Sequence, residues 1–171
     1  SLGDNTNYVV QPGRYIGGMK VTGEARVLMN PGVYYIDGGG FEFSSKGTIE
    51  AYGVMLCNTG SSDVGWDQLM VSGDGTVRWT PPDSGVYAGI SIFYDRSIDD
   101  KKLEISGNGN MQIDGAVYAA GAEVQLSGNG PTDLLGGGFV VRKMQISGDG
   151  SFSVGDDNTS SPTGSHVFLV D

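Results

Sequence analysis

Three aspartates that stand directly after apolar stretches are the residues of this sequence best suited to acid–base chemistry. Asp37, Asp95 and Asp114 each follow a predicted strand, and Asp95 is followed by Arg96. Two carboxyl groups about 5–9 Å apart could cleave a glycosidic bond. Asp95 and Arg96 can equally form a surface ion pair at the start of a loop. Acids, bases and aromatic residues do not recur together at matching positions, so we assign no catalytic role to these aspartates.

The other candidates for metal or nucleophile chemistry are isolated. His166 is the only histidine, which rules out a histidine-rich metal site and leaves a Ser-His-Asp triad without a motif. Cys57 is the only cysteine, so no internal disulfide can form, and a packed thiol is favoured over a nucleophile. Asp156, Asp157 and Asn158 could bind Ca²⁺, although solvated loop acids are the simpler interpretation. We predict no metal, cofactor or catalytic residue.

A five-residue motif, apolar-Ser-Gly-Asx-Gly, recurs along the chain. It reads VSGDG at 71–75, ISGNG at 105–109, LSGNG at 126–130 and ISGDG at 146–150, with a degenerate copy, VTGEA, at 21–25. Glycine and Asx tolerate the left-handed backbone of a sharp corner, and Ser and Asx side chains can bond nearby backbone or stack on their copies. The motif is not a calcium-binding nonapeptide, because apolar residues such as Met111 stand where the aspartate ligand belongs.

The residues around each corner alternate between apolar and polar. Leu103 and Ile105 share one face, and Lys102 and Glu104 share the other. A period of two is typical of a half-buried strand, and no helical period is sustained. The sequence therefore predicts short strands and almost no helix.

The spacing of the corners predicts the architecture. Gly107 and Gly128 are 21 residues apart, and Gly128 and Gly148 are 20 apart. A period near 20 made of three short strands favours an all-β fold, a right-handed parallel β-helix (solenoid) of about eight short coils. An antiparallel β-sandwich is the alternative. Residues 1–171 should form a single β-helix domain, a fragment of a longer protein, with three protruding loops at 57–68, 93–102 and 153–166.

The composition and net charge of the chain disfavour several classes of binding partner. Twenty acidic and ten basic residues give a net charge of −10, which disfavours nucleic acid and anionic lipid. Thirty glycines occur with 38% hydrophobic residues and without a Gly-X-Y period, which excludes collagen and disorder. No apolar run approaches the roughly 20 residues of a membrane span, so we expect no membrane insertion in this segment.

Two surface patterns have structural alternatives. A glycine-to-tyrosine pattern recurs at Tyr15, Tyr34, Tyr87 and Tyr118. Tyrosine ladders can bind sugars, but packing against the neighbouring coil is favoured in a solenoid. Ice binding would need a flat array of threonines, whereas the predicted outward positions carry Glu, Lys and Gln.

Several longer stretches resemble a known family. MNPGVYYIDGGGFEF, PPDSGVYAGISIFYDR, NGNMQIDGAVYAAGAEVQLSGNG and GGFVVRKMQISGDG are similar to the C-terminal β-helix region of bacterial Tad-type (Flp) pilus-assembly proteins of the TadG-like group, over roughly residues 29–154. This chain has Tyr118-Ala119-Ala120 where the pattern often has proline. Bactofilin-like polymer-forming β-helices are a more distant resemblance. The resemblance implies a bacterial cell-envelope or extracellular location and a structural role, and it supplies no catalytic residues.

Together these features predict a non-catalytic structural or interaction module of a bacterial surface or secreted protein, linked to pilus assembly or adhesion. The expected partners are other envelope or pilus proteins, with end-to-end self-association and a glycan as further candidates. The alternative is a polysaccharide-binding or polysaccharide-cleaving β-helix.

Overall fold

Parallel strands make up the computed structural model, which describes residues 1–59, 68–97, 101–129, 132–135, 138–149, 152–155 and 168–169. Within these ranges the chain forms eighteen strands and no helix, as the alternation predicts. All named strand pairs are parallel. The antiparallel β-sandwich is therefore wrong. No helix within these ranges is long and apolar enough to cross a membrane.

The first sheet has seven strands, and each strand pairs with the next one of this sheet along the chain. Their order is β1 (Asn7–Val10), β4 (Arg26–Met29), β7 (Thr48–Ala51), β10 (Thr76–Trp79), β13 (Asn110–Asp114), β15 (Thr132–Leu135) and β17 (Phe152–Gly155).

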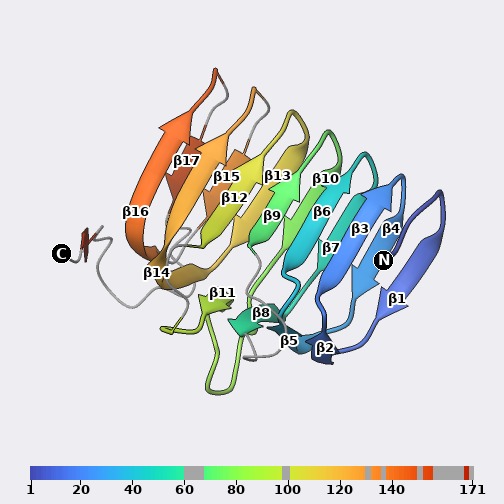
Figure 1. Ribbon diagram of the computed structural model, residues 1–171, viewed down its shortest axis with the longest axis horizontal. Helices are drawn as coiled ribbons and strands as arrows, with labels where there is room; N and C mark the ends of the chain where they lie inside the picture. Colours follow the sequence, from blue (N-terminus) through green and yellow to red (C-terminus); the bar gives the residue numbers. More distant parts are fainter. Residues whose placement is uncertain are drawn as a thin grey trace.

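The second sheet has two arms joined by a long strand (Figure 1). One arm contains β2 (Gly13–Ile16), β5 (Gly32–Asp37), β8 (Val54–Thr59) and β11 (Ile90–Tyr94). The other contains β3 (Met19–Gly23), β6 (Phe41–Ser45), β9 (Leu69–Ser72) and β12 (Lys102–Ser106). Both arms pair with β14 (Ala116–Ser127), which pairs with β16 (Phe139–Ser147), and β16 pairs with β18 (Phe168–Leu169).

The chain visits the sheets in a repeating order. One strand of the first sheet is followed by one strand from each arm of the second, and the next repeat pairs in register with the last. The first sheet counts seven repeats in the described residues rather than about eight. Two repeats are longer than the predicted spacing of about 20 residues. They are the repeats between the starts of β7, β10 and β13, which lie at Thr48, Thr76 and Asn110.

Glycine is required at the corners because stacked backbones approach closely there. Gly107 has a φ of 136°, and a Cβ on it would lie 2.1 Å from the carbonyl oxygen of Gly73 in the previous repeat. A Cβ on Gly128 would lie 2.1 Å from the oxygen of Gly107. The Asx residues of the motif behave differently, since Asp4 is the only non-glycine with positive φ in the described chain. The expectation that corner Asx residues adopt the left-handed conformation is wrong.

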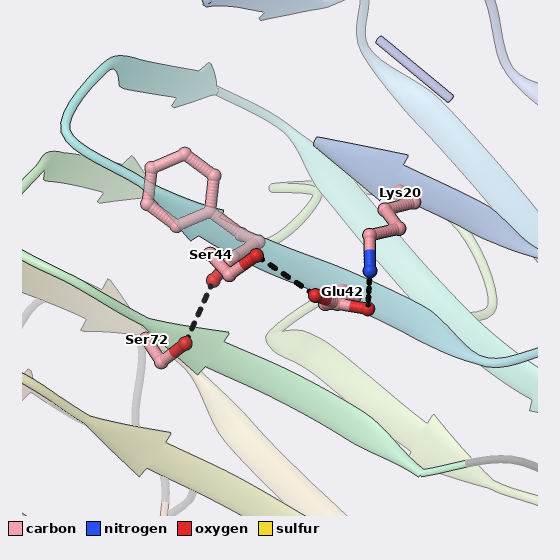
Figure 2. A network of polar contacts seen from close by, with 5 residues as sticks. Lys20, Glu42, Ser44 and Ser72 are labelled. Carbon is pink, nitrogen blue, oxygen red and sulfur yellow. Dashed lines mark hydrogen bonds and ion pairs between the residues drawn. The ribbon is translucent and has the colours of Figure 1, made fainter. Parts of the chain in front are cut away.

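The Ser and Asx side chains of the corners contact one another and the nearby backbone. The serine position is in register through six repeats, at Thr22, Ser44, Ser72, Ser106, Ser127 and Ser147. Figure 2 shows the first repeats of this serine column. Lys20 donates to Glu42, Ser44 donates to Glu42, and Ser72 donates to the backbone carbonyl of the residue between Glu42 and Ser44. The Asn108 amide donates to Asp74 one repeat earlier at 3.2 Å. Stacking of corner side chains on their copies is thus confirmed at Asn108.

Inward-facing residues form one continuous hydrophobic core. Phe41 and Trp79 meet edge to face, with ring centroids 6.0 Å apart, and Trp79 Nε1 donates to the carbonyl of Val54. Trp79 is paired with Ala51 in the adjacent strand, so a small residue lies beside the largest one. In the described residues, buried side-chain N and O atoms all have a hydrogen-bond partner, as a close-packed interior requires.

The predicted loops are shorter where the structure describes them. Cys57–Thr59 belong to β8, Phe93 and Tyr94 to β11, and Ser153–Gly155 to β17. These residues continue the pairing of their strands, which the polar sequence around them obscured. Residues 60–67, 98–100 and 156–166 of those predicted loops lie outside the described residues.

Candidate functional site

The predicted acidic residues do not assemble into an acid–base pair. Asp37 is 2% exposed, and Arg14 Nε donates to its Oδ2 at 2.6 Å. Asp95 accepts hydrogen bonds from the backbone and hydroxyl of Ser97, which lower the pKa of its carboxyl. A general acid needs a raised pKa. Asp95 is therefore held as an ionised structural group, and Asp37 is the buried partner of Arg14 in an ion pair.

Asp114 lies at a different corner of the molecule from Asp95. It ends β13 in the first sheet, whereas Asp95 follows β11 in the second. The Asp114 carbonyl accepts a hydrogen bond from the Ser91 hydroxyl, and Ser91 lies four positions before Asp95 along the chain. At about 3.3 Å per residue, these four positions span about 13 Å, which exceeds the roughly 5–9 Å of a catalytic carboxylate pair.

The remaining predicted sites are only partly described. Asp156, Asp157, Asn158 and His166 lie outside the described residues. Within the described ranges, no three His, Cys, Asp or Glu side chains gather as a metal site would require.

An apolar column on the outside of the second sheet is the feature that an ordinary half-buried sheet does not explain. We call it the aromatic stripe, and it consists of Tyr35, Cys57, Phe93, Tyr118 and Val140, one residue per strand and each in register with the next. Their neighbours along the strands, such as Tyr34, Leu56 and Val117, belong to the core, whereas the stripe does not. Since side chains alternate along a strand, the stripe faces outward.

The corresponding columns on the other faces are polar apart from Met70. On the first sheet, one outward column is Asn7, Arg26, Thr48, Thr76 and Asn110. On the second arm it is Lys20, Glu42, Met70, Glu104, Gln125 and Gln145. Only one of the three surfaces carries an apolar ladder along its length.

The stripe is held rigidly by its own contacts. The Phe93 and Tyr118 rings stack with centroids 5.2 Å apart and an interplanar angle of 10°. The Arg96 guanidinium lies 5.5 Å from the centre of the Tyr118 ring, a cation–π contact. The sequence suggested that Asp95 and Arg96 form an ion pair. In the structure Asp95 instead accepts hydrogen bonds from Ser97, and Arg96 contacts the Tyr118 ring.

Residues 80–89, which connect β10 to β11, lie over part of this surface, and we call them the cover segment. Figure 1 shows them as a long connection extending beside β8 and β11. The Tyr35 hydroxyl donates to Tyr87, which raises the pKa of Tyr35. Met55, one strand from Tyr35, is fully buried although it is not part of the core. The hydrogen bond to Tyr35 therefore places the cover segment beside the outer face of β5.

Cys57 lies in the middle of the stripe and is 6% exposed. Burial, with a smaller contribution from the Asp95 carboxylate, raises the pKa of its thiol to about 11. A nucleophilic cysteine needs a lowered pKa. The packed thiol predicted from the sequence is confirmed.

The glycine-to-tyrosine pattern divides between two surfaces. Tyr34 is buried and stacks on Tyr15 of the previous repeat at 5.8 Å, which confirms packing against a neighbouring coil for that pair. Tyr118 also packs on the neighbouring repeat, but on the outside. Sequence reasoning missed the stripe, although a signal existed. VMLC at 54–57 and IFY at 92–94 are apolar at consecutive positions, so apolar residues fall on both faces of these strands.

The arrangement offers a preformed apolar ridge with polar borders and no reactive group. Tyr35 and Val140 are 37% and 36% exposed, so the ridge retains contact with solvent. Apolar and aromatic residues in such a row are suited to binding a partner surface. Comparison with known protein families, curated proteins and solved structures finds no match to this chain.

Proposed function

We propose that this chain is a right-handed parallel β-helix that acts as a non-catalytic interaction module, and that it binds a partner protein through the aromatic stripe. The parallel register of three strands per repeat supports the β-helix, and parallel crossovers are nearly always right-handed. A stack of short coils is a stiff scaffold on which one surface can be presented over several repeats.

The single observation that carries the proposal is the break in polarity on one face. The stripe contains apolar or aromatic residues in five neighbouring strands, from Tyr35 to Val140. Leaving such residues on the outside has a cost in solubility, which a chain with two polar faces could avoid. Burial against a partner removes that cost at about 25 cal/mol per Å² of apolar surface.

A protein partner fits the ring geometry better than a glycan. Sugars stack on the open faces of aromatic rings, whereas one face each of Phe93 and Tyr118 is used by the other ring. The Arg96 guanidinium also lies close to the Tyr118 ring, in a cation–π contact. The ring edges and the Val140 side chain that remain accessible suit apolar contacts with a protein surface.

The resemblance to Tad-type pilus-assembly proteins supports the choice of partner. On this proposal the module belongs to a bacterial surface or secreted protein, and its partner is another envelope or pilus-assembly protein. The role is structural, in pilus assembly or adhesion.

Site-specific photocrosslinking tests the proposal. We would place p-benzoylphenylalanine at position 118 on the stripe or, as a control, in place of Glu50 on the outer face of β7, and identify the crosslinked proteins from cells of the source organism. We expect one dominant envelope or pilus-assembly protein from position 118 and none from position 50. The double variant Tyr35→Ser, Val140→Ser should weaken the purified complex at least tenfold, since two apolar contacts are lost.

Three results would contradict it. Equal crosslinking from both positions would remove the stripe as the binding surface, and crosslinks only between copies of this chain would replace the partner by self-association. Turnover of a polysaccharide in a reducing-sugar assay that Asp95→Asn abolishes would overturn the non-catalytic assignment.

A further inference from the structure

An open polar cavity of about 310 Å³ lies at the start of the molecule, away from the aromatic stripe. Seven residues line it, none of them with an apolar side chain: Asn5, Asn7, Glu24, Arg26, Lys46, Gly47 and Thr48. Its volume is at the lower end of the range of small-molecule sites, about 300–1,000 Å³. A wholly polar lining suits a hydrophilic ligand.

The fold holds these residues in a regular array. Asn7, Arg26 and Thr48 are in register on β1, β4 and β7, so neighbouring side chains start about 4.8 Å apart. Lys46 comes from the corner before Thr48, where the backbone is fixed by hydrogen bonds from Lys46 N to Gly23 O and from Thr48 N to Ala25 O. The backbone that carries the cavity lining is therefore held in place before a ligand binds.

The corner sequence is what changes the charge here. Gly75 packs against Gly47, so Lys46 and Asp74 occupy the same position in consecutive repeats. At the corner of the following repeat, the Asn108 amide donates a hydrogen bond to Asp74. At the corners with Asx residues the position is acidic or neutral, and at Lys46 it is cationic.

Charge in the cavity is opposite in sign to that of the whole chain. Arg26, Lys46 and Glu24 sum to +1, whereas the chain carries −10. The ion pairs among the described residues use Arg14, Lys20 and Lys143, so neither Arg26 nor Lys46 is neutralised by one there. Two cations that line one cavity and form no ion pair with another described residue favour an anionic group, and Arg binds a carboxylate with two parallel hydrogen bonds.

We propose that this cavity binds a single sugar acid, such as one hexuronate residue of an otherwise neutral glycan. Arg26 and Lys46 bind the carboxylate, while Asn7, Thr48 and Glu24 bind hydroxyl groups. The Glu24 carboxylate accepts hydrogen bonds from hydroxyls but repels a simple anion, which favours a ligand that has both groups. A polyuronate is disfavoured because the net charge of the chain repels a polyanion.

Amide chemical-shift titration with methyl β-glucuronide tests the site. We expect saturable shifts confined to the amides around Asn7, Arg26 and Thr48, and no saturable shift with methyl β-glucoside or with acetate. Lys46→Gln and Arg26→Gln should each raise the dissociation constant at least tenfold. Arg78→Gln is the matched control, because Arg78 lies on the same sheet outside the cavity lining.

Each part of the proposal has a result that would contradict it. Equal shifts with the neutral glucoside would overturn the role of the two cations, and equal binding of acetate would overturn the sugar specificity. An Arg78→Gln effect as large as that of Lys46→Gln would reduce the site to general electrostatics. Lys46 is exposed at a corner, so its variant remains informative if Arg26→Gln does not fold. Neither result bears on the proposed protein interface, which lies on the other sheet.

Discussion

At the residue scale, the corner glycines are required by contact more than by conformation. A Cβ at Gly107 would overlap the carbonyl oxygen of Gly73 at 2.1 Å, well inside any real carbon–oxygen contact. The same overlap recurs at Gly128 and Gly148 with the corner before each. Left-handed backbone alone would permit asparagine, whereas this overlap excludes every residue except glycine.

Gly107→Ala and Gly85→Ala separate the two effects. Both glycines have positive φ, at 136° and 85°, but a Cβ on Gly85 would meet nothing within 4 Å. We expect Gly85→Ala to lower the free energy of unfolding by about 1–2 kcal/mol, from backbone strain alone. Gly107→Ala should lower it by about 3–5 kcal/mol, because overpacking adds to the strain.

Urea denaturation of both variants and the parent checks this comparison. Equal destabilisation at the two positions would mean that the close approach of the corners contributes nothing.

The thiol of Cys57 should titrate late. Its pKa in the folded chain is raised to about 11, above the roughly 8.5 of an unfolded cysteine. The raised value means that this group contributes stability below about pH 8.5, and that the contribution is lost as the pH rises through about 11. The rate of alkylation by iodoacetamide should have its midpoint near pH 11 in the native protein and near 8.5 in urea. A native midpoint near 8.5 would show that the thiol is not buried.

At the element scale, β8 is a strand with apolar residues on both of its faces. Val54 and Leu56 face the core, and Met55 and Cys57 face outward yet are buried. Such a strand is stable only when something covers its outer face, since exposed apolar residues gain nothing on folding. We expect the cover segment to do this for Cys57, because Tyr87 contacts Tyr35, the residue paired with Cys57.

Tyr87→Ala should open the cover segment. The substitution removes the hydrogen bond that Tyr35 donates to Tyr87 and the ring that carries it. We expect alkylation of Cys57 to accelerate at least tenfold, because a loss of about 1.4 kcal/mol in local closure increases the open population tenfold. The measurement is the alkylation rate at constant pH, below the thiol pKa.

Tyr52→Ala is the matched control, since Tyr52 is a 48% exposed tyrosine in a turn outside the stripe. An unchanged rate in Tyr87→Ala, or an equal increase in Tyr52→Ala, would mean that the segment does not shield the thiol.

At the scale of the whole molecule, each repeat is an interchangeable unit. Ser106 pairs with Ser127, and the glycines that follow them occupy equivalent corners. Because each repeat contacts only its neighbours, stability in such a stack is close to a sum over repeats.

Deletion of residues 107–127 removes one complete repeat and joins Ser106 to Gly128. We expect this variant to fold with a cooperative transition and to lose about 1–3 kcal/mol of stability, at roughly 0.05–0.15 kcal/mol per residue. Deletion of residues 107–117 joins Ser106 to Tyr118 and destroys both the corner and the register, so it should show no cooperative unfolding. Circular dichroism during thermal unfolding distinguishes the two.

If both deletions behave alike, the repeats are not equivalent units, and the proposed β-helix would need revision.

Prediction succeeded where neighbours in sequence carry the information. Leu103 and Ile105 alternate with Lys102 and Glu104, and this pattern alone predicts a strand with one buried face. The lengths of two repeats were not predicted, because the segments between β7, β10 and β13 are longer than the corner spacing. Insertions of this kind leave no mark on the motif itself.

Thus the sequence alone determined the strands and the corners between them, because alternation and turn chemistry depend on adjacent residues. Only the tertiary structure decided that the strands pair in parallel and which residues of different repeats share a column. Tyr35, Cys57, Phe93 and Tyr118 form a row through register across 83 residues of chain, and Arg26 and Lys46 meet at one cavity. Such proximity is set by backbone hydrogen bonds between distant strands, which no local pattern specifies.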